Sequence, residues 1–130
     1  MDASVYQPYI AAWRKRRAEE QQRQQARAAA GRELARQCAR FLAAQYGARR
    51  VILFGSLARG EAVHAQSDID LAVEGLAPAV YFRALAQVWQ LLPLDVELDL
   101  VPLETARPEL LEHIAEEGIV LYEQIPRSTR

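Results

Sequence analysis

Residues 51–73 read VILFGSLARGEAVHAQSDIDLAV, and this stretch decides how the chain folds. It opens with a short apolar run, Val51–Phe54, which Gly55 closes and which is typical of a buried strand. It ends in a second strand, Ser67–Val73, whose side chains alternate between two faces. One face carries Ile69, Leu71 and Val73, and the other carries Asp68 and Asp70. The stretch therefore predicts two strands joined by a turn and a polar loop.

Further helices and strands are predicted on both sides of this stretch. Apolar residues recur at helical spacing in three segments. These are residues 34–46, where Gly47 is a plausible stop, and residues 79–92 and 107–117. Two more strands are expected at Leu94–Val101, which alternates apolar with acidic residues, and at Ile119–Tyr122. The alternation of helices and strands along the chain predicts an α/β (α+β) fold, with helices packed on a small mixed sheet of about four strands.

The N-terminal segment differs from the rest of the chain. Residues 14–33 contain no apolar side chain larger than alanine. Their residue types favour a helix, and Glu19 and Arg23 have the spacing of an i,i+4 ion pair. Such a helix would have no apolar face to bury against the rest of the protein. Upstream, Tyr6, Tyr9, Ile10 and Trp13 form a short apolar stripe at helical spacing. We therefore expect a basic helical extension over residues 1–33, a globular domain over 34–125 and a tail over 126–130. The stripe is either a docking element, for a partner or for self-association, or part of a frayed, solvated helix.

Length and composition narrow the class of protein. The 130 residues suit one compact domain, and the net charge of −1 hides two opposite halves. Residues 1–50 hold 11 basic and 4 acidic residues, whereas residues 51–130 hold 5 and 13. No apolar run approaches the ~20 residues of a membrane span, and no signal-peptide pattern is present, so we expect a cytoplasmic protein. The single cysteine, Cys38, lies on an apolar helix face and is expected in the core, as are Tyr81 and Trp89.

The turn after the first predicted strand has the residues of a phosphate-binding site. Gly55 lets the backbone approach a ligand closely, and Ser56 adds a hydroxyl and a backbone N–H at the start of a helical turn. Arg59 projects from the same turn and can fork onto phosphate oxygens. Asp68 and Asp70 then share one face of a strand, with Cα atoms about 6.6–6.8 Å apart, within reach of one or two shared divalent cations. A phosphate cradle beside paired carboxylates predicts nucleotide chemistry.

This ordered combination, a strand, Gly-Ser-x-x-Arg-Gly and then Ser-Asp-Ile-Asp-Leu on another strand, resembles the nucleotidyltransferase superfamily of DNA polymerase β. The small size resembles its minimal nucleotidyltransferase (MNT) branch. The downstream Asp-Leu-Val-Pro-Leu, a helix and Gly-Ile-Val-Leu-Tyr-Glu also look like that branch, so the resemblance covers about residues 34–123. The loop between Ser56 and Asp68 has eleven residues, slightly more than in many relatives, and holds His64, which is expected to be solvated.

The resemblance implies a role for each matching residue. Gly55 and Ser56 would bind phosphate, Arg59 would contact the triphosphate, and the two strand aspartates and Asp99 would be the catalytic metal ligands. Asp99 best fits the family's third carboxylate, although Asp95 and Glu97 share its face and stay open. The implied cofactor is Mg²⁺, with two ions in the complete site, and the implied substrate is ATP.

The acceptor of the nucleotide is the remaining question. A core of about 90 residues leaves no further domain to hold an acceptor, so a partner or a second copy must supply that surface. Resemblance to MNT antitoxins implies a HEPN-type ribonuclease toxin as partner, with AMP transferred to one of its tyrosines. Two alternatives stay open: a small-molecule nucleotidyltransferase acting on an aminoglycoside-like acceptor, and a protein that acts by binding alone. Nucleic-acid binding is disfavoured, because residues 14–33 lack aromatic side chains to stack on bases.

Overall fold

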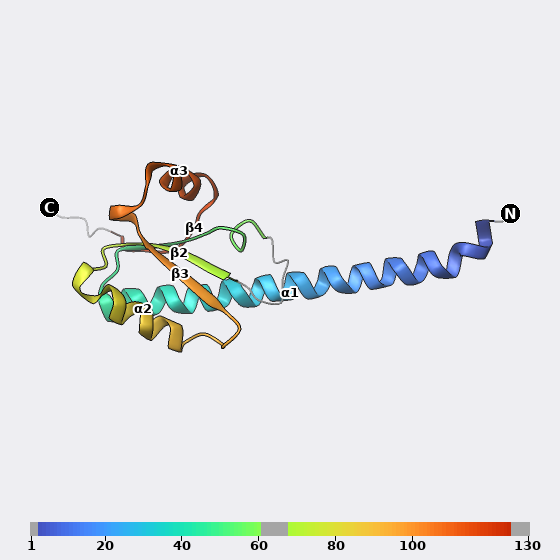
Figure 1. Cartoon of the computed structure of the whole chain (residues 1–130), viewed down its shortest axis with the longest axis horizontal. Helices are drawn as coiled ribbons and strands as arrows, with labels where there is room; N and C mark the ends of the chain where they lie inside the picture. The colour runs from blue at the N-terminus through green and yellow to red at the C-terminus, as the bar shows by residue number, and fades with distance from the viewer. Residues whose placement is uncertain (1–2, 61–67, 126–130) are drawn as a thin grey trace.

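A computed structural model of the chain describes residues 3–60 and 68–125. Four strands form one sheet in the order β3-β2-β1-β4 (Figure 1). They are β1 (Arg50–Phe54), β2 (Asp68–Glu74), β3 (Glu97–Pro102) and β4 (Ile119–Glu123). β1 pairs antiparallel with both β2 and β4, whereas β2 and β3 are parallel and are joined through a helix. The expected mixed four-stranded sheet is confirmed.

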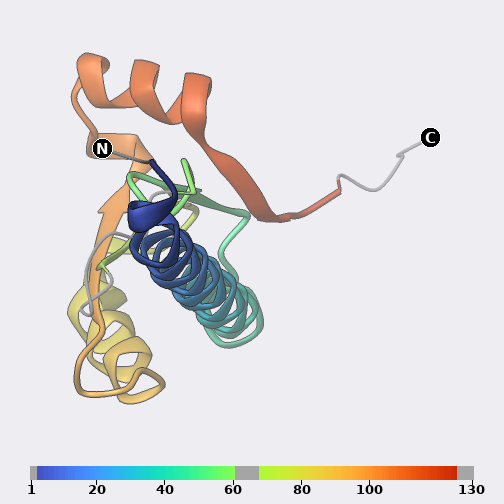
Figure 2. The same ribbon diagram turned by 90° about the vertical axis from the view of Figure 1, so that its right-hand side faces the viewer.

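Helices cover both faces of the sheet (Figure 2). They are α1 (Gln7–Tyr46), α2 (Tyr81–Gln90) and α3 (Pro108–Glu117), with 3-10 turns at Ala3–Tyr6, Pro78–Val80 and Leu103–Thr105. α1 and α2 pack on one face, where they bury the main core, and α3 packs on the other. Because side chains alternate along a strand, Val51 and Leu53 enter the main core while Ile52 meets Ile114 of α3.

α1 is one continuous helix whose second half belongs to the core, and Gly47 ends it with φ of +70° as expected. Packing begins earlier than we expected, because Ala28 and Gly31 are buried within the segment that lacked any large apolar residue. A Cβ at Gly31 would lie 3.1 Å from the Leu57 side chain. Small side chains thus let the helix approach the turn after β1 closely. The expectation that residues 14–33 have no face to bury was therefore wrong for the C-terminal end of this segment.

The first half of α1 projects from the domain with its side chains in solvent (Figure 1). Tyr9 and Trp13 are exposed, and the Arg17 guanidinium lies 5.2 Å from the Trp13 ring centroid. Arg23 pairs with Glu20 at 2.8 Å, three residues away, rather than with Glu19 as we expected. No helix in the described ranges is both long and apolar enough to span a bilayer.

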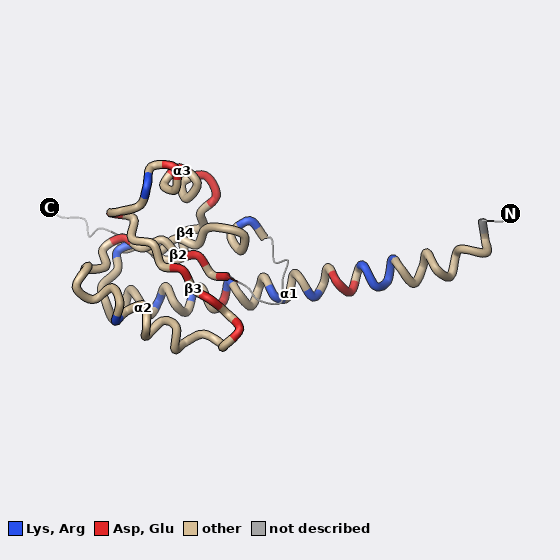
Figure 3. The backbone as a smooth tube through the Cα atoms, in the orientation of Figure 1, with Lys and Arg blue, Asp and Glu red and all other residues tan. Residues whose placement is uncertain are grey.

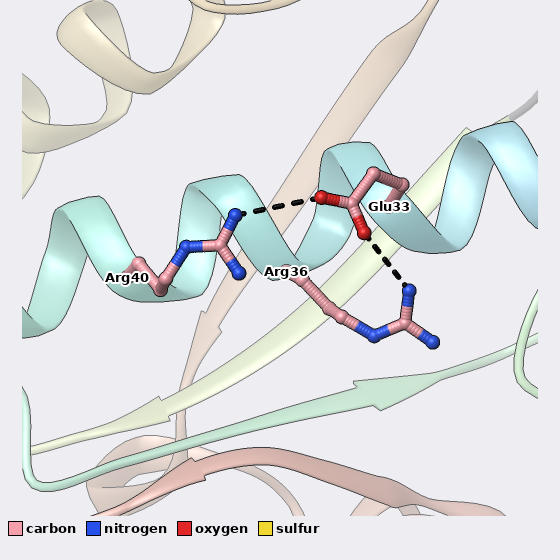
Figure 4. Close-up of polar contacts among 3 residues, drawn as sticks. All are labelled: Glu33, Arg36 and Arg40. Carbon is pink, nitrogen blue, oxygen red and sulfur yellow. Dashed lines mark hydrogen bonds and ion pairs between the residues drawn. The ribbon is translucent and has the colours of Figure 1, made fainter.

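Exposed ion pairs also line the second half of α1. Glu33 accepts from Arg36 at 3.1 Å and from Arg40 at 3.5 Å (Figure 4). All three side chains are about half exposed, so each pair contributes at most about 1 kcal/mol. These contacts solubilise the helix surface and leave its opposite side to the core.

The structure corrects two expectations about apolar side chains. β3 begins at Glu97, so Leu94 lies in the preceding turn, wholly exposed, and not on the inner face of a strand. Trp89 is also exposed, because α2 buries only a narrow stripe through Ala84 and Val88. Tyr81 does pack against the core, and its hydroxyl donates to the Leu100 carbonyl at 2.6 Å.

Cys38 lies in the main core, as expected. It is 1% exposed, and burial raises the pKa of its thiol to about 11. A thiol with so high a pKa stays protonated near neutral pH and is a poor nucleophile. Cys38 is therefore a packing residue.

Candidate functional site

The candidate residues gather at one edge of the sheet. β1 runs antiparallel to β2 and β3, so the end of β1 meets the beginnings of the other two strands. Gly55 follows β1, Asp68 and Asp70 are the first and third residues of β2, and Asp99 lies near the start of β3. The topology therefore brings together residues that are far apart in sequence, on the face that α3 covers only in part.

Gly55 and Asp70 are in close contact across β1 and β2. Phe54 pairs with Asp70, and Gly55 then turns the chain with φ of +78°, a conformation that favours glycine. A Cβ at Gly55 would lie 2.3 Å from Asp70 Oδ2, closer than any real contact allows. We expected Gly55 to leave room for a ligand; the group that needs this room in the structure is the carboxylate of Asp70.

Asp70 and Asp99 are register partners in the parallel pair of β2 and β3. Burial raises the pKa of Asp70, and the charges of Asp99 and Asp68 raise it further, whereas Arg59 lowers it. Asp70 is half-buried, and the other two aspartates are exposed. Asp99, Asp68 and Arg59 therefore all lie close enough to act on Asp70, as a shared site requires.

The two other acids that sequence reasoning left open occupy different places. Glu97 is the register partner of Asp68, at the very start of β3. Asp95 precedes the strand and lies in a turn. Asp99 is the acid that stands beside Asp70, so of the three it is the one that the fold sets next to the half-buried carboxylate.

The turn from Ser56 to Gly60 is held by its own hydrogen bonds and by α1. The Arg59 N–H donates to the Gly55 carbonyl and the Gly60 N–H to the Leu57 carbonyl, both at 3.2 Å. Leu57 is buried, and Arg32 of α1 donates from Nε to its carbonyl at 3.2 Å. Ser56 is half-buried at the start of this turn. The turn thus presents Arg59 from a fixed base.

Arg59 also contacts α3. Its Nη1 lies 2.9 Å from Oε2 of Glu117, a hydrogen-bonded ion pair between partly exposed side chains. Sequence reasoning missed Glu117 and Arg32, because these contacts join residues 58 and 25 positions apart and leave no local pattern. His113 lies exposed on α3, whereas His64, which we expected to be solvated, falls outside the described residues.

The donors at this edge are carboxylate oxygens, the ligands that Mg²⁺ prefers. Within residues 3–60 and 68–125, no three His, Cys, Asp or Glu side chains form a ready-made metal site. Acidic residues cluster on β2, β3 and α3, and basic residues are spread along α1 (Figure 3). The division of charge seen in the sequence is therefore also a division between the sheet edge and the long helix.

Comparison with solved structures relates this fold to toxin–antitoxin complexes. A toxin–antitoxin structure with AMP-PNP matches with 26% identity and a TM-score of 0.57, covering 68% of this chain and 73% of that chain. A MntA–HepT toxin–antitoxin structure shares the fold at 22% identity and a TM-score of 0.52, covering 72% and 73%. A complex of a tri-AMPylated Shewanella oneidensis HEPN toxin with an MNT antitoxin matches more weakly, at 23% identity and a TM-score of 0.46, covering 78% and 73%.

None of the curated proteins compared with this chain matches it. The sequence model of one family, Polymerase beta, Nucleotidyltransferase, does match, over residues 36–127, which span the end of α1 and all four strands. Most of the chain is thus accounted for by a single family. The chain belongs to the polymerase β nucleotidyltransferase family.

Proposed function

We propose that this protein transfers AMP from ATP to a hydroxyl group, in a Mg²⁺-dependent reaction. The observation that carries the proposal is the pairing of Asp70 with Asp99 beside the turn that presents Ser56 and Arg59. Carboxylates alone would repel a triphosphate, and a cationic side chain alone would not activate a hydroxyl. Their presence at one sheet edge suits a reaction that needs both.

Asp68, Asp70 and Asp99 would hold Mg²⁺. Burial and then the charges of Asp99 and Asp68 raise the pKa of Asp70, and a bound cation would offset that cost, so the donor set fits the ion. Mg²⁺ commonly uses only one or two carboxylates and takes its other ligands from water and substrate phosphates, so a complete protein cage is not needed. When bound, the ion neutralises phosphate charge and lowers the pKa of an attacking hydroxyl.

The chain's own residues then have distinct tasks. The acceptor hydroxyl gives its proton to the Asp99 carboxylate while its oxygen forms a bond to the α-phosphorus. The bond from that phosphorus to the bridging oxygen breaks, and pyrophosphate leaves with both bonding electrons. Ser56 and Arg59 orient the phosphates for in-line displacement, a positioning effect. Asp99 is exposed where Asp70 is half-buried, so it is the better placed of the two to meet an incoming acceptor.

The acceptor that we propose is a tyrosine of a HEPN-type toxin, for which this chain is the antitoxin. The 26% identical structure is a toxin–antitoxin complex with AMP-PNP, which supports both an adenine nucleotide and a protein partner. The described domain is little more than the sheet and its helices, so the acceptor surface must come from outside it.

The exposed half of α1 is suited to hold that partner. Ile10 and Trp13 precede the buried Ala28 and Gly31 by 18 residues, which is about five full helical turns, so they point to the same side of the helix. α1 passes the site where Gly31 meets Leu57, and its exposed half continues beyond that edge. A protein bound to the Ile10–Trp13 side would therefore lie over the edge that carries Asp70 and Asp99.

The test uses the whole chain with ATP, Mg²⁺ and the product of the neighbouring reading frame, followed by mass measurement of both proteins. A partner heavier by one or more AMP groups, with the site on tyrosine, supports the proposal. A stable complex without a mass change contradicts transfer and favours a protein that acts by binding. A parallel reaction contains an aminoglycoside, and its adenylylation together with an unmodified partner contradicts the protein acceptor.

A further inference from the structure

We infer that Glu117 is the counter-ion that holds Arg59 until a triphosphate takes its place, and that Glu117 thereby sets the affinity of the site for triphosphates. The inference rests on the proposed function, in which Arg59 contacts the phosphates. It adds α3 to the site, although neither the glycine-serine turn nor the strand aspartates lie on that helix. The contact that carries it is the 2.9 Å pair between Arg59 Nη1 and Glu117 Oε2.

Glu117 sits on a rigid base. Glu117 is the last residue of α3, and the next residue, Gly118, packs closely against both the helix and the sheet. A Cβ at Gly118 would lie 2.4 Å from the Ile114 carbonyl and 2.6 Å from Ile52 Cγ2. Ile114 itself is buried. The backbone beside Glu117 is therefore fixed, as is the turn that carries Arg59, so the ion pair can break and form again through side-chain rotation alone.

A carboxylate at this position needs a counter-ion. The carbonyl end of a helix carries partial negative charge, so an acidic residue there is unfavourable. α3 has no basic residue in its last turn. Arg59 reaches this helix end from the turn after β1 and offsets the charge.

Arg59 holds Glu117 through Nη1, and a fork onto a triphosphate that uses this nitrogen takes it away from the carboxylate. Both ligands are anionic, but the triphosphate carries more charge and more oxygens, so it displaces the carboxylate when it binds. The ion pair with Glu117 must then be broken, and this lowers the net gain on binding. When pyrophosphate leaves, Arg59 can return to Glu117, which favours product release. The effect depends on the outer phosphates, so AMP, which has none, is insensitive to it.

The chain offers a matched control for this test. Glu116 is the exposed neighbour of Glu117 on the same helix, and its change to glutamine removes the same charge. Binding of AMP-PNP, tripolyphosphate and AMP is measured by calorimetry for the full-length protein and for Glu117→Gln, Glu116→Gln, Arg59→Ala and the double variant Arg59→Ala/Glu117→Gln. Thermal unfolding of each variant reports whether it is folded.

Glu117→Gln is expected to bind AMP-PNP and tripolyphosphate about two- to fivefold more tightly, the size of effect that an exposed ion pair gives. Its affinity for AMP stays unchanged, Glu116→Gln behaves like the original chain, and in the Arg59→Ala background the substitution at Glu117 has no further effect. Equal or weaker triphosphate binding by Glu117→Gln overturns the inference, as does tightening that persists without Arg59. If the unaltered chain binds neither AMP-PNP nor tripolyphosphate, the proposed function fails and this inference falls with it.

Discussion

Asp70 of β2 and Asp99 of β3 stand side by side as register partners in a parallel strand pair, and the charge of Asp99 adds to the effect of burial in raising the pKa of Asp70. Nothing in the folding of a sheet calls for two carboxylates at neighbouring positions, one of them half-buried. Such an arrangement lowers the stability of the protein, and it persists where function requires it. The sheet edge is therefore both the proposed active site and a source of instability that substitution can relieve.

We predict that Asp70→Asn stabilises the protein when no divalent cation is added. The pKa of Asp70 is raised in the folded state, so its ionised form is less favourable there than in the unfolded chain. Stability of the original chain therefore falls as pH rises from the ordinary aspartate pKa through the raised one, and stays lower above it. The amide carries no charge at any of these pH values. At neutral pH the melting temperature of the variant should be higher by a few degrees.

The matched control for this prediction is Asp95→Asn. Asp95 is exposed in the turn before β3, so its change to asparagine should leave the melting temperature within about one degree of the original. Added Mg²⁺ should raise the melting temperature of the original chain and have a smaller effect on Asp70→Asn. An Asp70→Asn variant that melts below the original chain across pH 5–8 contradicts the prediction.

Gly55→Ala should destabilise the protein more than Gly47→Ala does. Both glycines have positive φ, so alanine at either position is strained, at a cost of about 1–2 kcal/mol. A Cβ at Gly47 meets nothing within 4 Å, whereas one at Gly55 would lie 2.3 Å from Asp70 Oδ2. The difference between the two free energies of unfolding, measured in urea, isolates the clash with Asp70. Shortening the carboxylate in Gly55→Ala/Asp70→Ala should recover that difference and leave the φ strain; two single variants of equal stability would show that Asp70 moves aside freely.

Substitutions at the acidic residues should reveal which of them carry nucleotide transfer. Asp70→Asn and Asp99→Asn are each expected to lower the rate by at least about 100-fold, because each removes a carboxylate that would hold Mg²⁺, and at Asp99 also the group that would accept the proton. Asp95→Asn should keep nearly full activity, since its residue lies outside β3. The rates are measured as pyrophosphate release, and circular dichroism checks that each variant is folded. A loss at Glu97→Gln as large as that at Asp99→Asn would move the third carboxylate to Glu97.

The sequence predicted the sheet well, because alternation along β2 and the apolar run of β1 reflect burial on known faces. It misplaced the start of β3, since Leu94 continues the alternation although the chain there still forms a turn. It also missed where α1 joins the core. Ala28 and Gly31 are buried through close approach rather than through large apolar side chains, and hydrophobic periodicity does not register that kind of contact.

At the site, too, the sequence predicted what local patterns encode and missed contacts between distant residues. The residues of the turn after β1 and of β2 lie in one short stretch, so their spacing alone suggested a shared edge. The contact of Arg59 with Glu117 depends on how α3 packs against the sheet, which no local pattern encodes. The roles assigned to the site residues stay predictions that the substitutions above test.

The exposed half of α1 should be needed for modification of a protein partner and dispensable for nucleotide binding. Changing Tyr6, Ile10 and Trp13 together to alanine removes three of the four side chains of the apolar stripe and leaves the core residues of the helix in place. We expect the rate of partner modification at low partner concentration to fall by at least about tenfold, the effect of losing one or two well-packed aromatic contacts. Affinity for AMP-PNP should not change, because even Trp13, the stripe residue nearest to the site, lies ~27 Å along the helix from Gly31 at 1.5 Å per residue.

The control for the stripe is a pair of exposed residues on the other side of the same helix segment. Lys15 and Gln22 lie about half a turn from Tyr6 and Trp13, so Lys15→Ala/Gln22→Ala alters the helix surface without touching the stripe. This variant should modify the partner at the original rate. The alternative hypothesis is that the stripe joins two copies of this chain. Sedimentation of the chain without its partner tests this alternative, and we expect the original chain to sediment as a monomer. A dimer that the triple alanine variant dissolves, with unchanged partner modification, would assign the stripe to self-association.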